Sequence, residues 1–83
     1  INKGAKMTKL QLKFLQDLKS CPEHNGGEWY WKPEAHKHFL SLGWKDKSFK
    51  AVLGSLYKKE ILLPEVEMFF IYDTEIWQQV KEM

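Results

Sequence analysis

The 83-residue sequence contains no arginine, and all 13 of its strongly basic residues are lysines. Arginine makes the bidentate contacts to guanine and phosphate, so any nucleic-acid binding here must depend on lysine. A single cysteine, Cys21, excludes an internal disulfide and fits a reducing compartment, cytoplasmic or, in a eukaryote, nuclear. No apolar run approaches the roughly 18 residues that a membrane span requires. These absences favour an intracellular domain without a membrane partner.

Sequence patterns typical of enzymes are also missing. There is no phosphate-binding glycine-rich loop, no nucleophile elbow and no pair of carboxylates in a plausible cleft. We therefore expect no enzymatic activity, no cofactor and no small-molecule substrate. Cys21 and His24 have the spacing of a zinc half-site, but His36 and His38 would lie roughly 200° apart on a helix. No metal site is expected.

Charge is distributed unevenly along the chain, although the formal net charge is only +2. Residues 32–59 hold seven lysines against two acidic residues, a net charge of +5. Residues 60–83 hold one lysine against six acidic residues, a net charge of −5. The basic part predicts a patch that could attract nucleic acid, or a solvated helix face without a ligand.

The length allows one small domain, which we place at residues 8–83, after a polar linker or tag remnant at residues 1–7. Thr8 and Gln11 have the spacing of a capping box, with Met7 as part of a hydrophobic staple. They predict a helix that ends near Cys21. Its inward stripe comprises Leu10, Phe14, Leu15 and Leu18.

The next elements are a short strand near residues 28–31 and a second helix. Alternation in the strand places Trp29 and Trp31 on one face and Tyr30 on the other. Pro33 suits the first turn of the helix, and Gly43 suits a left-handed cap after it. This helix should turn inward its apolar residues Ala35, Phe39, Leu40 and Leu42.

A third helix is expected over residues 46–59, with Asp46 or Ser48 as its N-cap. Its core face would hold Phe49, Val52, Leu53, Leu56 and Tyr57. A hairpin near 61–72 follows, with its tip at Pro64 to Glu67. Asp73 or Thr74 then caps a last helix, whose inward residues would be Ile76, Trp77 and Val80.

The stretch "LGWKDKSFKAVLGSLYKKEILL" resembles the helix-turn-helix of winged-helix domains. The resemblance lies in Leu42 and Gly43 followed by apolar Trp44, and in the spacing of Leu53, Leu56 and Ile61. It implies an α+β fold with a three-helix core, a small antiparallel sheet, the 61–72 hairpin as the wing, and a closing helix. Glu60 replaces the glycine that usually ends the family's recognition helix.

Winged-helix domains commonly bind DNA by placing this helix in the major groove. The resemblance implies that role for the outward residues of helix 46–59 and for the lysine before it: Lys45, Lys47, Ser48, Lys50, Ala51, Gly54 and Lys58. Gly54 in the middle of this helix lowers helix stability by on the order of 1 kcal/mol relative to alanine. Together with Ala51 and Ser55 it leaves a face of small side chains. We expect a double-stranded DNA-binding module of a transcription regulator, or of a replication or mobile-element protein, that holds phosphates mainly through lysine.

The alternative is a winged helix that binds a partner protein, or dimerises, without binding DNA. The missing arginines favour this interpretation, as do Glu65 and Glu67 at the predicted tip, because carboxylates repel phosphates. An exposed ring in the aromatic cluster could anchor a partner. The candidate contacts are Trp29, Tyr30, Trp31 and Trp77. If the chain is instead a DNA-binding regulator, a dimer is expected, because one such helix reads only a short site, and Trp77 and Met83 of the last helix are its candidate contact.

Overall fold

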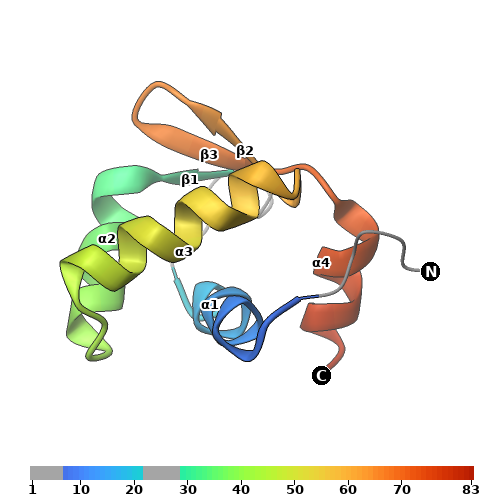
Figure 1. Cartoon of the computed structure of the whole chain (residues 1–83), viewed down its shortest axis with the longest axis horizontal. Coiled ribbons are helices and arrows are strands. Elements are labelled where there is room, and N and C mark those ends of the chain that lie inside the picture. Colours follow the sequence, from blue (N-terminus) through green and yellow to red (C-terminus); the bar gives the residue numbers. More distant parts are fainter. Residues whose placement is uncertain (1–6, 22–28) are drawn as a thin grey trace.

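A computed structural model describes residues 7–21 and 29–83, which form four helices and one three-stranded sheet (Figure 1). Most of the predicted linker and the loop with His24 lie outside these residues. Met7, which we expected in a hydrophobic staple, packs against the core. The elements are α1 (Lys9–Leu18), β1 (Trp29–Trp31), α2 (Lys32–Ser41), α3 (Asp46–Lys58), β2 (Leu62–Glu65), β3 (Met68–Ile71) and α4 (Thr74–Lys81).

The antiparallel sheet has the strand order β1-β3-β2. In the view of Figure 1 it lies above α1, with α2 on one side and α4 on the other. The register pairs Tyr30 with Phe69, and their rings stack with centroids 5.7 Å apart on the core side. Pro64 lies on the edge strand β2, where its missing N–H costs no ladder hydrogen bond in the sheet interior.

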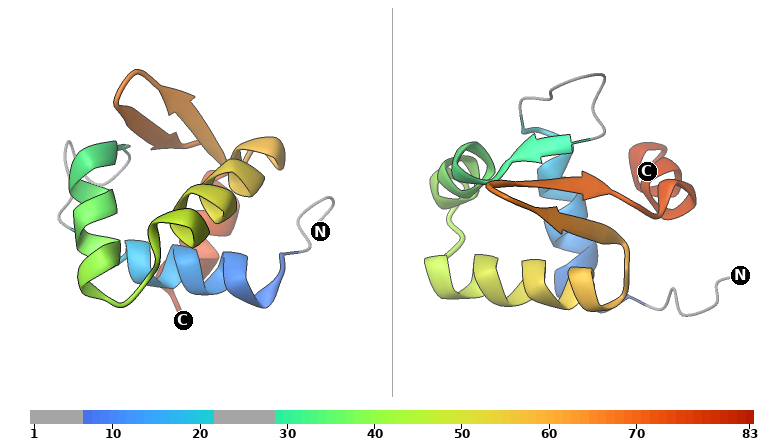
Figure 2. Two further views of the ribbon diagram at one scale, coloured as in Figure 1. Left: turned by 60° about the vertical axis from the view of Figure 1, so that its left-hand side comes forward. Right: turned by 90° about the horizontal axis from the view of Figure 1, so that it is seen from above.

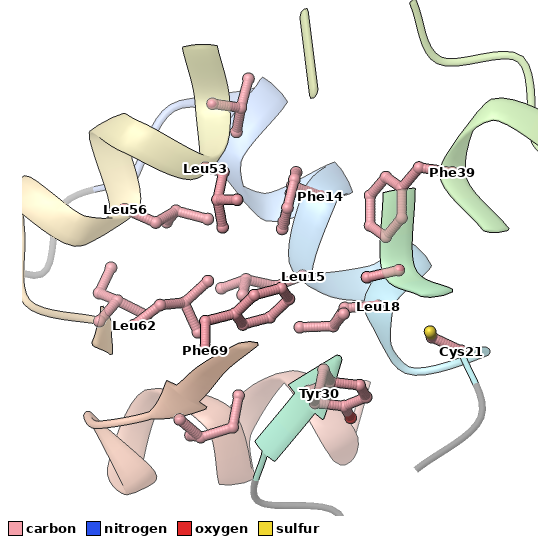
Figure 3. Close-up of a cluster of buried hydrophobic side chains, with 14 of the residues drawn as sticks. Phe14, Leu15, Leu18, Cys21, Tyr30, Phe39, Leu53, Leu56, Leu62 and Phe69 are labelled. Atoms are coloured by element: carbon pink, nitrogen blue, oxygen red, sulfur yellow. The ribbon is translucent and has the colours of Figure 1, made fainter. Parts of the chain in front are cut away.

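The core is centred on Phe14 of α1, which contacts aromatic rings from α2 and α3. Its ring centroid lies 4.5 Å from that of Phe39 and 5.5 Å from that of Phe49. Trp44, from the α2–α3 turn, closes the same cluster edge-on at 5.6 Å. Figure 3 shows leucines of α1 and α3 meeting the sheet below this group. The aromatic cluster therefore fixes the angle between α2 and α3.

The predicted helix boundaries hold at three ends. Gln11 N donates to Thr8 Oγ1 and Thr8 N donates to Gln11 Oε1, each at 3.0 Å, so the capping box is confirmed. Asp73 Oδ1 accepts from Ile76 N at 3.0 Å and caps α4. Gly43 has a φ of 100° and terminates α2 as expected.

Other predictions about the helices are wrong. The N-cap of α3 is Lys45, which has no side-chain cap, and Asp46 lies in the first turn instead. Leu10, Leu40 and Leu42 are exposed. On α2 only Ala35 and Phe39 face the core, and the buried Trp44 packs against Phe39 with ring centroids 5.4 Å apart.

Candidate nucleic-acid interface

The outward face of α3 is the candidate interface, and it lies at one edge of the molecule. In the right panel of Figure 2 the sheet and the other helices all lie on one side of α3. The inward residues Phe49, Val52, Leu53 and Leu56 are buried as predicted, and Tyr57 is half-buried. Six of the seven predicted contact residues are exposed and only Gly54 is half-buried, which leaves Lys45, Lys47, Ser48, Lys50, Ala51 and Lys58 open to solvent.

The lysines on this face differ in their electrostatic surroundings. Lys50 Nζ lies 3.4 Å from Asp46 Oδ2, one turn earlier on α3. Lys45, Lys47 and Lys58 form no ion pair with any residue that the structure describes. Three of the predicted lysines therefore have no acidic group of the described chain within ion-pair distance, whereas Lys50 is paired with Asp46.

Asp46 also lies beside α2. His36 Nε2 is 2.6 Å from Asp46 Oδ1. Desolvation acts to raise the pKa of the Asp46 carboxyl, but His36 and Lys50 together lower it below its ordinary value. Asp46 therefore stays ionised and adds a negative charge to the face. The i, i+4 spacing of Asp46 and Lys50 is a signal that sequence alone could have supplied.

Ser55, which we expected on the small-residue face, is engaged by α1 instead. Gln11 Nε2 donates to Ser55 Oγ at 2.9 Å, and Ser55 Oγ donates to the Val52 carbonyl at 2.7 Å. Lys59 Nζ donates to Gln11 Oε1 at 2.9 Å. Of the three residues that we expected to form the small-residue face, only Ala51 and Gly54 are therefore free of a contact with α1.

Gly54 borders a groove of about 670 Å³ between α3, the start of α2 and the β2–β3 hairpin. A Cβ at this glycine would meet no atom within 4 Å, so its lack of a side chain is not required by packing within the described chain. Tyr57 also lines the groove; its buried hydroxyl has no hydrogen-bond partner among residues 7–21 and 29–83. We call it the α3 groove; its lining is Lys32, Pro33, His36, Phe49, Lys50, Leu53, Gly54, Tyr57 and Glu67.

The hairpin tip, which we define as Glu65, Val66 and Glu67, is acidic. The turn occupies Val66 and Glu67, at the end of the predicted range, and Glu67 has a φ of 60°. Lys32 N donates to the Glu67 carbonyl at 2.8 Å, which ties the tip to the start of α2. Val66 is 83% exposed. The tip thus presents one apolar side chain between two carboxylates.

The predicted partner-contact aromatics separate into exposed and buried rings. Trp31 is 37% exposed and Trp29 is half-buried, and the two share the outer sheet face as predicted. Tyr30 is fully buried, and Trp77 is only 4% exposed, with its ring edge-on to Tyr30. Tyr30 and Trp77 are core residues, so assigning them to a partner contact was wrong. Trp77 was itself placed inward by the helical pattern, which was the better guide.

Two further features of the described residues concern metal binding and membrane spans. No group of three metal-ligating side chains occurs within residues 7–21 and 29–83. His38 Nε2 lies 2.8 Å from Ser20 Oγ, apart from the His36–Asp46 pair, and Cys21 is buried. In the same part of the chain no helix combines the length and apolar character needed to cross a bilayer.

Comparison with known proteins identifies no relative. No protein-family model, no curated protein and no solved structure gives a significant match to this chain. The case for a function therefore depends on the residues and geometry described above.

Proposed function

We propose that the chain is a winged-helix module that binds double-stranded DNA through α3. One observation carries the proposal: Lys45, Lys47 and Lys58 lie exposed along the free side of α3 without an acidic partner in the described chain. The order of the elements supports the winged-helix assignment. Helix α2 ends at a left-handed glycine, the turn leads directly into α3, and a hairpin and a closing helix follow.

In this proposal α3 enters the major groove, which is wide enough for a helix. Lys47 and Ser48, in its first turn, would lie nearest the base edges. Lys45 and Lys58 would neutralise phosphates at the two ends of the helix, and Lys47 would neutralise a third phosphate at the edge of the groove. Ala51 and Gly54 leave room for close approach of the DNA between them.

Two features predict modest sequence preference. Lysine can reach guanine O6 and N7, but it is a flexible point charge without the rigid planar fork of arginine, so it discriminates between bases less sharply. Asp46 and the hairpin tip add carboxylates beside the lysines, and these repel phosphates. We therefore expect the hairpin to stay off the DNA and the affinity to come from phosphate contacts. Such a module would suit a transcription regulator, or a replication or mobile-element protein.

Binding of random-sequence duplex DNA at two salt concentrations tests the proposal. Three phosphate contacts should make affinity fall about fortyfold between about 50 and 200 mM salt, because each contact contributes about −0.9 to the slope of log affinity against log salt. Fluorescence anisotropy of a labelled duplex measures this directly. An absence of binding at the lower salt concentration would refute the DNA proposal for this chain.

The α3 groove supports a second candidate, a protein-binding module without DNA binding. The groove has apolar walls from Phe49, Leu53 and Tyr57, beside the half-buried Gly54 of the same helix. Clefts of this kind accept an apolar side chain of a partner. Saturable protein binding together with an absence of DNA binding would favour this candidate.

A further inference from the structure

The α3 groove and the hairpin tip have complementary chemistry. The groove offers apolar walls from Phe49, Leu53 and Tyr57. Lys32, His36 and Lys50 lie on its lining together with one acidic residue, Glu67. Asp46, just outside the lining, contacts His36 and Lys50 and leaves Lys32 as the lysine of the lining without an ion pair among the described residues. An occupant that fits would carry an apolar side chain flanked by carboxylates, because it would fill the walls and meet the basic groups.

The chain itself presents this occupant. Val66 is 83% exposed, more than any other large apolar side chain of residues 7–21 and 29–83, and Glu65 and Glu67 flank it. The tip cannot enter the groove of its own molecule, because Glu67 is already part of that groove and its carbonyl is bound by Lys32 N at 2.8 Å. It is available to a second copy.

We propose that two copies associate by reciprocal exchange, with Val66 of each copy inserted into the α3 groove of the other. Tip and groove are neighbours on one molecule, since Glu67 belongs to both, so a two-fold axis beside them closes the exchange at two copies. Glu65 of each copy then lies near Lys50 or His36 of the other.

Gly54 has a clear role in this arrangement. Its missing side chain leaves space that no atom of the described chain fills, at the expense of helix propensity. The valine of the second copy would occupy that space. The association also covers Lys50 and Gly54 on the face proposed to meet DNA, so the dimer and the DNA complex exclude each other.

Sedimentation equilibrium of the full chain without DNA tests this inference independently of the proposed function. The wild-type protein should show a monomer–dimer equilibrium. Each valine contact is worth about tenfold in affinity, so V66S, which removes both, should raise the dimer dissociation constant about a hundredfold. L42S changes an exposed leucine at the end of α2, outside the α3 groove and the hairpin tip, and should leave the constant unchanged.

A second variant fills the groove from within. G54L introduces a good helix former at a site with open space, so it should not destabilise the monomer, yet it should abolish dimerisation. A wild-type protein that stays monomeric at every concentration would overturn the inference. So would a dimer that survives both V66S and G54L, because it would have to use another surface, such as the outer sheet face.

Discussion

Gln11 of α1 and Ser55 of α3 are joined by a hydrogen bond of 2.9 Å between the amide Nε2 and the hydroxyl Oγ. Gln11 is the only buried polar residue among those described, and it also accepts from Lys59 Nζ and from Thr8 N. One side chain therefore starts α1 and fixes α3 against it. The contact lies on the side of α3 that faces α1, away from the outward lysines.

We expect Q11A to lower the free energy of unfolding by about 1–3 kcal/mol, because it removes the capping box of α1 and the side-chain hydrogen bond from Gln11 to Ser55. Urea denaturation measures the change. Q16A, on the exposed side of the same helix, serves as the matched control and should have little effect. If the double variant Q11A/S55A loses as much free energy of unfolding as the two single variants added together, the two residues are not coupled as the contact requires.

The two described glycines should respond to alanine in opposite directions. G54A should stabilise the fold by about 1 kcal/mol, because alanine is the better helix former and its Cβ meets nothing within 4 Å. G43A should destabilise it by about 1–2 kcal/mol, because Gly43 has a φ of 100°. Thermal unfolding of both variants checks the pair. Loss of stability in G54A would show that the space beside it is filled.

Glu60 follows α3 in a left-handed conformation, with a φ of 61°. Ile61 N donates to the Leu56 carbonyl at 3.0 Å across this residue, the hydrogen bond of a Schellman motif. E60G should therefore raise the free energy of unfolding by about 1 kcal/mol. E82G is the control, because Glu82 has a φ of −88° and gains nothing from glycine. Equal effects of both changes would contradict this explanation.

Tyr57 should ionise late in an alkaline titration, because burial raises the pKa of its hydroxyl to about 12 from 10.0. A raised pKa in the folded state means that the contribution of Tyr57 to stability is fully present below pH 10 and is lost as the pH rises toward 12. In an alkaline titration followed by tyrosinate absorbance, the wild-type protein should show the late ionisation of Tyr57, and Y57F should lack it. Ionisation of Tyr57 in the ordinary range would mean that its hydroxyl is exposed.

Local signals in the sequence predicted the elements well, because caps and periodicity act over a few residues. The Thr8–Gln11 box, Gly43 and Asp73 all mark ends where expected. Leu40 and Leu42 were misplaced because a helical pattern on a short helix does not show which neighbour fills the core, and Trp44 does so here.

The site was only partly predictable, since its features depend on distant residues. The lysines lie outward as the α3 periodicity indicated. The Gln11–Ser55 contact spans 44 residues, and the α3 groove combines three elements. No local pattern reports either of them. The burial of Trp77 was predictable from its helical position, and only its assignment to a partner contact went wrong.

Replacing Asp46 should change DNA affinity in the opposite direction from replacing the lysines. Its carboxylate lies 3.4 Å from Lys50 Nζ on the proposed DNA face. D46N removes that negative charge and frees Lys50, so it should strengthen DNA binding severalfold at low salt and steepen the salt dependence. Anisotropy titrations measure both. Weaker binding by a well-folded D46N would contradict the proposed face.

The salt dependence of DNA affinity in two charge-matched double variants tests the central claim most directly. With three phosphate contacts, the wild-type slope of log affinity against log salt should be about −2.7, and K47Q/K58Q should reduce it to about −0.9. K19Q/K81Q lowers the net charge by the same amount as K47Q/K58Q. Because Lys19 lies at the end of α1 and Lys81 lies on α4, this variant should keep the wild-type slope. Equal loss in the two variants would show that net charge, and not the face of α3, holds the DNA.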